Sequence, residues 1–317
     1  MAVLGRIRER QDELGVVLEA VYRYFGITRQ GILKGLTRQK KRAELMADIG
    51  FLVAAYRRTK DRRAGSRSLY YNLDIKTRYG LGVNKFERLM AEAGLTLAPL
   101  KLKVITTVSC YQSWQYENLA NGLKVNDINK IVVGDITYLF VDRERYYLFC
   151  LTDVYSARIV GSHISQRIRS MDAHLALDAW IALRGKEAIK DCIHHTDGGG
   201  QYFSTTYIEA LVDCKIAIST ARNCLQNGYA EQRNGLLKNH LLPTRNLSRP
   251  DLIRTELAEV IRFYNEERKQ EGLGWRSPVA YENYISRVAL EERDTLELYT
   301  FEDPCKNGFS RHEPAES

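Results

Sequence analysis

The chain has 317 residues, of which 44% are hydrophobic and 27% charged, with a formal net charge of +8. This composition is that of an ordinary globular protein, and the length predicts two or three domains. No apolar run approaches the roughly 18 residues of a membrane span, and the N-terminus is too charged for a signal peptide, so we expect a cytoplasmic protein without a membrane partner. The six cysteines lack CxxC spacing, so we expect neither a zinc site nor a disulfide framework.

Positive charge is concentrated in the first third of the chain. Residues 1–103 contain 22 Lys and Arg against 10 Asp and Glu, a net charge of +12. Residues 104–317 contain 25 against 29, a net charge of −4. This asymmetry is typical of a nucleic-acid-binding part joined to a catalytic part.

The basic third has helical periodicity throughout. Apolar residues recur at helical spacing before Gly26, and Thr28 can cap the helix that follows, which predicts a helix-turn-helix within residues 10–36. A basic helix is expected over residues 37–63, and further helices over 65–78 and 84–93. We therefore predict three segments, which are a basic helical segment at 1–60, a second DNA-binding module at 61–98 and a linker at 99–128.

The residue pattern changes from helical to strand-like at residue 129. Runs rich in Val, Ile, Tyr and Phe at 130–140 and 146–153 predict a hairpin. The elements expected to follow are a strand at 157–164, a helix at 172–184, a strand at 188–193, a helix at 205–214, a strand at 215–220 and a helix at 229–242. This order predicts an α/β catalytic domain with a mixed sheet over residues 129–285, followed by a tail at 286–317.

Three carboxylates have positions that indicate metal-dependent chemistry. Asp135 lies inside an apolar strand, Asp197 follows a strand and precedes three glycines, and Glu231 lies at the start of the long helix. A buried carboxylate costs several kcal/mol unless a cation compensates it. Oxygen ligands favour Mg²⁺ or Mn²⁺, and two such ions can activate the attacking oxygen and stabilise the leaving oxygen at phosphorus.

The segments around these carboxylates resemble a known family. They are Asp135–Tyr138 (DITY), His194–Ser204 (HHTDGGGQYFS), Asn227–Asn239 (NGYAEQRNGLLKN) and Phe263–Tyr281 (FYNEERKQEGLGWRSPVAY). They are similar to bacterial insertion-sequence transposases of the second-reading-frame type, which carry a retroviral-integrase-like core. The similarity covers about residues 15–284 and departs from the family pattern at Val132, where the family has Trp, and at Gln270, where it has His.

The resemblance implies a ribonuclease-H-like core preceded by all-α, helix-turn-helix-like DNA-binding modules. It implies a DDE transposase in which Asp135, Asp197 and Glu231 are catalytic and bind two Mg²⁺ or Mn²⁺ ions. Such an enzyme would cleave the element's terminal inverted repeats and join them to target DNA by transesterification. It would act as a homo-oligomer on the DNA of the bacterial nucleoid.

Four further residues are candidate DNA contacts. Lys238 lies seven residues after Glu231, on the face that helical spacing also gives to residues 235 and 242, and is predicted to contact a DNA phosphate or terminal base near the metals. Arg67 and Arg88 lie in segments that resemble the family's DNA-binding helices. His195 could orient a carboxylate, contact DNA or be packed inside a strand, and Asn227 is expected to cap the Glu231 helix.

Two other interpretations remain open. A catalytically silent DNA-binding regulator, or a partial transposase that needs an upstream reading frame, would share the same basic helices. A nonspecific ribonuclease-H-like nuclease would share the carboxylates but would not need two helical modules. Metal-dependent cleavage of end-containing DNA, compared with random DNA, distinguishes these possibilities.

Overall fold

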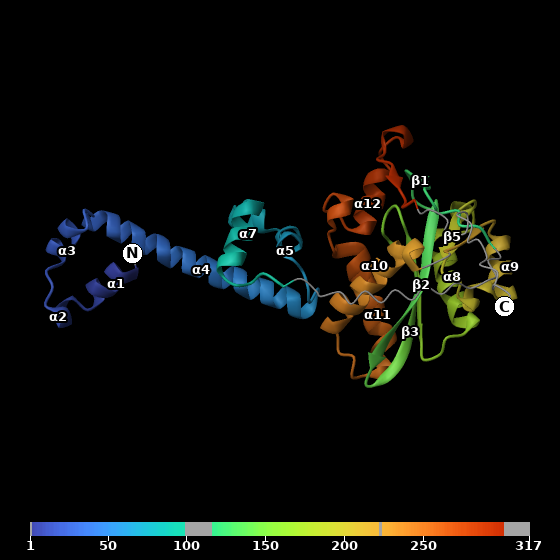
Figure 1. The fold of residues 1–317 in the computed structure, drawn as a ribbon, viewed down its shortest axis with the longest axis horizontal. Helices are drawn as coiled ribbons and strands as arrows, with labels where there is room; N and C mark the ends of the chain where they lie inside the picture. Colours follow the sequence, from blue (N-terminus) through green and yellow to red (C-terminus); the bar gives the residue numbers. More distant parts are fainter. Residues whose placement is uncertain (1, 99–115, 222–223, 301–317) are drawn as a thin grey trace, which may run out of the picture. The chain divides into compact units, whose positions relative to one another are not determined.

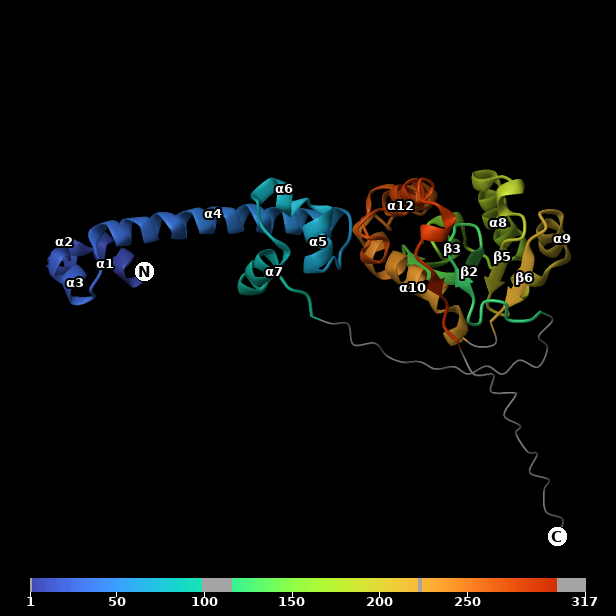
Figure 2. The same ribbon diagram turned by 90° about the horizontal axis from the view of Figure 1, so that it is seen from above.

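A computed structural model describes residues 2–98, 116–221 and 224–300, shown in Figures 1 and 2. Much of the expected linker and the end of the expected tail, at 99–115 and 301–317, therefore lie outside the described residues. The chain forms two compact units, one of Met1–Arg58 with Gly65–Ala98, and one of Thr59–Ala64 with Pro99–Ser317. No helix within the described ranges is long and apolar enough to cross a membrane.

The first unit begins with the helices α1 (Ala2–Glu9), α2 (Gln11–Leu14), α3 (Leu18–Tyr24) and α4 (Arg29–Thr59). Gly26 has a φ of +64°, and the Gly31 amide donates to Thr28 Oγ1 (3.0 Å), so the predicted turn and cap are present. The buried Tyr22 and Ile32 form a small hydrophobic core between α3 and α4. The prediction of separate helices around residue 37 was wrong, because α4 contains no proline and continues for 31 residues.

Three short helices complete the first unit, namely α5 (Ser66–Asn72), α6 (Ile75–Tyr79) and α7 (Val83–Glu92). The single helix predicted over residues 65–78 is divided because Asp74 adopts a left-handed conformation, with a φ of +50°. Tyr70 donates to the Leu81 carbonyl (2.9 Å) and its ring packs against the fully buried Phe86.

The second unit contains a five-stranded sheet. Its strands are β2 (Ile131–Val141), β3 (Glu144–Asp153), β4 (Ile159–Ser165), β5 (Ile193–Thr196) and β6 (Ala217–Thr220), in the order β4-β3-β2-β5-β6. The first three strands are antiparallel, and β5 and β6 are parallel to β2. This confirms the predicted mixed sheet, and the order is ribonuclease-H-like.

Two strand boundaries show how local conformation adjusts the sheet. Asp142 and Arg143 both have positive φ (45° and 69°), which gives the β2–β3 hairpin the tight two-residue turn that matches strand twist. The strand predicted at 188–193 was placed too early, because Glu187–Ile189 forms a 3₁₀ turn and β5 begins at Ile193.

Helices cover both faces of the sheet (Figure 1). Trp180 of α8 (Ser170–Arg184), together with α9 (Thr205–Asp213), packs with the sheet residues Val132 and Phe149. A Cβ at Gly161 would lie 2.2 Å from the Ala176 carbonyl oxygen, so α8 can approach β4 this closely only over glycine. The absence of a side chain at Gly161 therefore allows α8 to pack directly on β4.

The opposite face is covered by α10 (Gly228–Leu236) and α12 (Pro278–Ile285), with α11 (Ile253–Arg262) preceding α12 in the chain. Ala230 of α10 packs with Ile131 and Val133 of β2. Part of the predicted tail belongs to this core, because β7 (Leu296–Glu297) pairs with β1 (Lys124–Val125) and the buried Leu298 joins the same cluster.

The helix of α10 continues into a π-helical turn, Leu237–Leu241, on which the segment 59–64 packs. Asp61 is fully buried; its carboxylate lies 3.1 Å from Arg268 Nη2 and 3.3 Å from His240 Nδ1. The Arg62 amide donates to the His240 carbonyl (3.0 Å). The chain that leaves α4 is thus anchored by a buried charge to the continuation of α10.

Candidate active site

The sheet brings the three predicted carboxylates to one edge. Gly134 of β2 pairs with Thr196, the last residue of the parallel strand β5, so Asp135 in β2 lies next to Asp197, which directly follows β5. Glu231 lies in the first turn of α10, which packs on β2 through Ala230. Residues separated by almost a hundred positions in the sequence therefore share one site.

The carboxylates influence one another electrostatically. The pKa of Asp135 is raised to about 6, chiefly by desolvation and also by the charges of Asp197 and Glu231. The Asn234 amide, which donates to Asp135 Oδ2 (2.7 Å), lowers this pKa. Desolvation also raises the pKa of Asp197, and desolvation followed by the Asp197 charge raises that of Glu231. Asp197 and Glu231 retain solvent access, so their desolvation is partial.

The donor set suits a hard divalent cation. Among the described residues, no three His, Cys, Asp or Glu side chains already enclose a cation position. Asp135 is oriented by Asn234, whereas Glu231 is exposed, so closure around an ion requires a side-chain movement that Glu231 is free to make. All three carboxylates have raised pKa values, and the charges of Asp197 and Glu231 contribute to this at Asp135. Oxygen donors in such an environment favour binding of Mg²⁺ or Mn²⁺.

The start of α10 is tied directly to the strand that carries Asp135. Asn227 is the N-cap residue but makes no side-chain capping bond. Its amide instead donates to the Gly134 carbonyl (3.0 Å), one residue before Asp135. The predicted capping role was therefore wrong, and the side chain fixes the helix that carries Glu231 against β2.

His195 belongs to a buried polar network behind the site. Its side chain is 1% exposed, its Nδ1 lies 2.8 Å from Ser219 Oγ and its Nε2 lies 3.2 Å from the Gln226 carbonyl. Ser219 Oγ accepts from the Leu119 amide (2.9 Å), so its hydroxyl can donate to Nδ1 while Nε2 donates to Gln226. Desolvation lowers the pKa of His195 to about 4, consistent with this neutral form.

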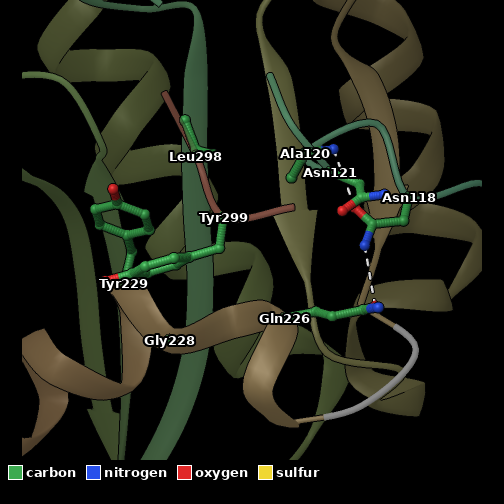
Figure 3. Close-up of a pocket in the computed structure, with 8 residues that line it drawn as sticks. All are labelled: Asn118, Ala120, Asn121, Gln226, Gly228, Tyr229, Leu298 and Tyr299. Atoms are coloured by element: carbon green, nitrogen blue, oxygen red, sulfur yellow. Dashed lines mark hydrogen bonds between the residues drawn. The ribbon is translucent and has the colours of Figure 1, made fainter. Parts of the chain in front are cut away.

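Figure 3 shows the pocket beside this network, where Gln226 reaches Asn118. The Asn118 amide donates to Gln226 Oε1 (3.0 Å), and Tyr229 packs against Tyr299 from the end of the described chain. The network joins β5, β6 and the turn before α10. Of the roles expected for His195, the structure supports the packed histidine, because both ring nitrogens face Ser219 and Gln226 and neither is accessible to DNA or directed at a carboxylate.

Comparisons with known proteins agree with this geometry. Residues 126–224 and 212–278 match families described as "Integrase core domain". An uncharacterized 31 kDa protein of insertion element IS600 from Shigella sonnei is 28% identical over 68% of this chain and 86% of its own length. The transposase for insertion sequence element IS904 from Lactococcus lactis is 32% identical over 53% of this chain and 68% of its own length.

The chain belongs to the insertion-sequence transposases with an integrase core. It is a DDE-type transposase, and its family depends on divalent metal ions. Among solved structures, the HTLV-2 integrase catalytic core in complex with magnesium is 22% identical over 49% of this chain and 97% of its own, with a TM-score of 0.41. The simian T-cell lymphotropic virus intasome is 18% identical over 69% and 74%, with a TM-score of 0.44.

Lys238 of the transposase lies beside the strand that carries Asp135. Its Nζ is 3.8 Å from the centroid of the Tyr138 ring, three residues beyond Asp135. The prediction that Leu242 shares a helix face with Glu231 was wrong. The π turn Leu237–Leu241 changes the angle between successive side chains about the helix axis. Leu242 is 1% exposed, whereas Glu231 is exposed.

The two candidate arginines belong to the first unit of the transposase. Arg67 at the start of α5 forms an ion pair with Glu87 of α7 (3.2 Å). Arg88 of α7 is exposed. Their roles as DNA contacts remain predictions.

The sequence interpretation missed Asn234 and Tyr138 as site residues. Asn234 follows Glu231 by three positions, which is one helical turn, so an amide next to the catalytic carboxylate on a helix was the available signal. Tyr138 ends the DITY motif that resembles the family, but its role was not inferred, because an aromatic residue in a strand is ordinarily part of the core.

Proposed function

We propose that Asp135, Asp197 and Glu231 bind two Mg²⁺ or Mn²⁺ ions, with which the transposase cleaves the terminal inverted repeats of its element and joins them to target DNA. The observation that carries this proposal is the meeting of the three carboxylates at one sheet edge, where the charges of Asp197 and Glu231 raise the pKa of Asp135 and the charge of Asp197 raises that of Glu231. When bound, the ions supply activation of the attacking oxygen and stabilisation of the leaving oxygen.

The protein contributes a rigid frame for this chemistry. Asn234 holds the Asp135 carboxylate, and Asn227 holds the start of α10 on the same strand. The neutral His195 network fixes the turn that leads into α10. These contacts fix Asp135 and the start of α10 relative to each other in advance, and the exposed side chain of Glu231 then completes the site.

DNA recognition is assigned to the first unit. Residues 1–103 have a net charge of +12, and the helix pair around Gly26 and Thr28 has the turn and cap of a helix-turn-helix. Joining both ends of an element in one reaction requires two sets of carboxylates, so the proposed active form is a homo-oligomer on DNA. A bacterial enzyme of this kind would act at the nucleoid.

The test uses isosteric variants that remove one charge at a time. Asp135→Asn, Asp197→Asn and Glu231→Gln should each abolish Mg²⁺-dependent cleavage of a terminal-repeat duplex and leave its binding affinity nearly unchanged. EDTA should abolish cleavage by the wild type, whereas Asp178→Asn, at an exposed position of α8, should cleave normally.

The same assay separates the remaining functions. Cleavage of scrambled duplexes at the same rate would indicate a nonspecific nuclease, and specific binding without any cleavage would indicate a silent regulator. Wild-type cleavage by any one of the three variants would remove that residue from the site.

A further inference from the structure

Two aromatic side chains on β2 are exposed next to the carboxylates. Tyr138 is 49% and Phe140 is 54% exposed, and their rings meet edge to face with centroids 6.0 Å apart. Single exposed apolar residues need no explanation. Two that contact each other on a strand otherwise rich in buried residues form a surface for a flat partner.

Cations from two other elements lie over these rings. The Arg145 guanidinium, on β3, is 5.5 Å from the Tyr138 centroid and 5.8 Å from that of Phe140. Lys238, after α10, lies 3.8 Å from the Tyr138 centroid. We name Tyr138, Phe140, Arg145 and Lys238 the hairpin aromatic patch.

The patch is continuous with the proposed active site. The helix and β2 run side by side, since Asn234 contacts Asp135 and Lys238 contacts Tyr138 further along both elements. Three strand residues span about 10 Å, which equals about three base-pair steps of B-DNA. Side chains three positions apart on a strand point to opposite faces, but β5 pairs with β2 only as far as Gly134. A strand end at the carboxylates would therefore pass the edge of β2 that β5 does not cover and bring its last few nucleotides to Tyr138.

The chemistry of the patch selects among possible occupants. Aromatic rings combined with cations bind unpaired bases, because a base that stacks on a ring takes the place of the cation there and the displaced cation can then contact a phosphate. A purely apolar partner would have to desolvate Arg145 and Lys238 without compensation. DNA meets both requirements and is the substrate of this family.

We propose that the hairpin aromatic patch stacks unpaired bases at the end of the DNA strand that enters the carboxylate site. The inference rests on the proposed function, because it needs a DNA end at Asp135. Stacking on Tyr138 would compensate for the unpairing that brings a terminal phosphodiester out of the duplex and into the site.

The experiment uses the full-length enzyme and duplexes of the element's own terminal repeat, which is read from the DNA that flanks the gene. 2-Aminopurine replaces bases near the terminus, either fully paired or unpaired by mismatches. Tyr138→Leu removes the ring, and Tyr138→Phe keeps it. Tyr284→Leu is the matched control, since Tyr284 is 46% exposed and carries Arg276 at 4.1 Å, but belongs to α12.

Wild-type enzyme should quench 2-aminopurine in unpaired ends and bind them more tightly than paired ends. Tyr138→Leu should lose the quenching and bind unpaired ends roughly five- to a hundredfold more weakly, with little change for paired DNA. Tyr138→Phe and Tyr284→Leu should behave like the wild type, because the first retains the stacking face and the second lies outside the patch.

Three results would overturn the inference. Tyr138→Leu could bind unpaired ends as tightly as the wild type, or Tyr284→Leu could lose as much affinity. Tyr138→Leu could also change the sedimentation of the DNA-free enzyme, which would make the patch an interface between copies. Loss of cleavage in Asp135→Asn is measured in parallel, so that a failure of stacking alone is distinguished from a failure of the proposed active site.

Discussion

Asp135→Asn should stabilise the metal-free transposase while it abolishes catalysis. The pKa of Asp135 is raised from 3.8 to about 6 by burial and by the neighbouring carboxylates. Because the folded-state pKa lies above the unfolded value, this group favours folding below about pH 4, and that contribution is lost as the pH rises through about 6. Asparagine retains the shape and an acceptor for Asn234 without the charge.

The shift corresponds to about 3 kcal/mol at pH 8, at about 1.4 kcal/mol for each pH unit. For a unit of this size, the variant should melt about 6–12 °C higher in EDTA. The advantage should fall to about half at pH 5, where the folded wild-type carboxyl is largely protonated but the unfolded one is still mostly ionised. Saturating Mg²⁺ should stabilise the wild type by about 2.7 kcal/mol at a hundredfold excess over Kd and should not stabilise the variant to this extent.

Intrinsic tryptophan fluorescence is a suitable assay, because Trp180 is fully buried in the core of the second unit. Asp178→Asn, on the exposed side of α8, is the control and should show no such pH-dependent gain. Equal melting temperatures of wild type and Asp135→Asn in EDTA at pH 8 would refute the reasoning. An advantage that is the same at pH 5 and pH 8 would also refute it.

Three further variants test the framework around the site. Asp61→Ala should lower the free energy of unfolding by about 3–5 kcal/mol in urea, because it leaves the buried Arg268 charge without its partner; a loss below about 0.5 kcal/mol would contradict a buried ion pair. His195→Gln should leave DNA-end affinity unchanged and reduce the loss of stability between about pH 6.5 and about pH 4, where the depressed pKa disfavours the folded state; a weaker affinity at unchanged stability would instead indicate a DNA contact. Asn234→Ala should raise the Mg²⁺ concentration for half-maximal cleavage several-fold without altering DNA binding, and an unchanged Mg²⁺ requirement would show that Asn234 does not orient Asp135.

The sequence alone determined the order of the core elements and the residues of the proposed metal site. Alternating β-branched and aromatic residues identified the hairpin that carries Asp135, and the glycines after Asp197 marked the end of the next strand. These features are local, since periodicity and turn chemistry act within a few residues. The motifs that surround the carboxylates then indicated the family, and the relatives confirm it.

The tertiary structure decided how those elements are joined. The π turn after α10 and the buried Asp61 depend on packing between residues about 180 positions apart in the sequence, so no local pattern encodes them. The same holds for His195, whose neighbours Ser219 and Gln226 make it a neutral structural residue, and for Tyr138, whose exposure only the finished sheet reveals. The burial of a side chain and its electrostatic interactions depend on all the groups around it in space. For these side chains, those groups come from segments far away in the sequence.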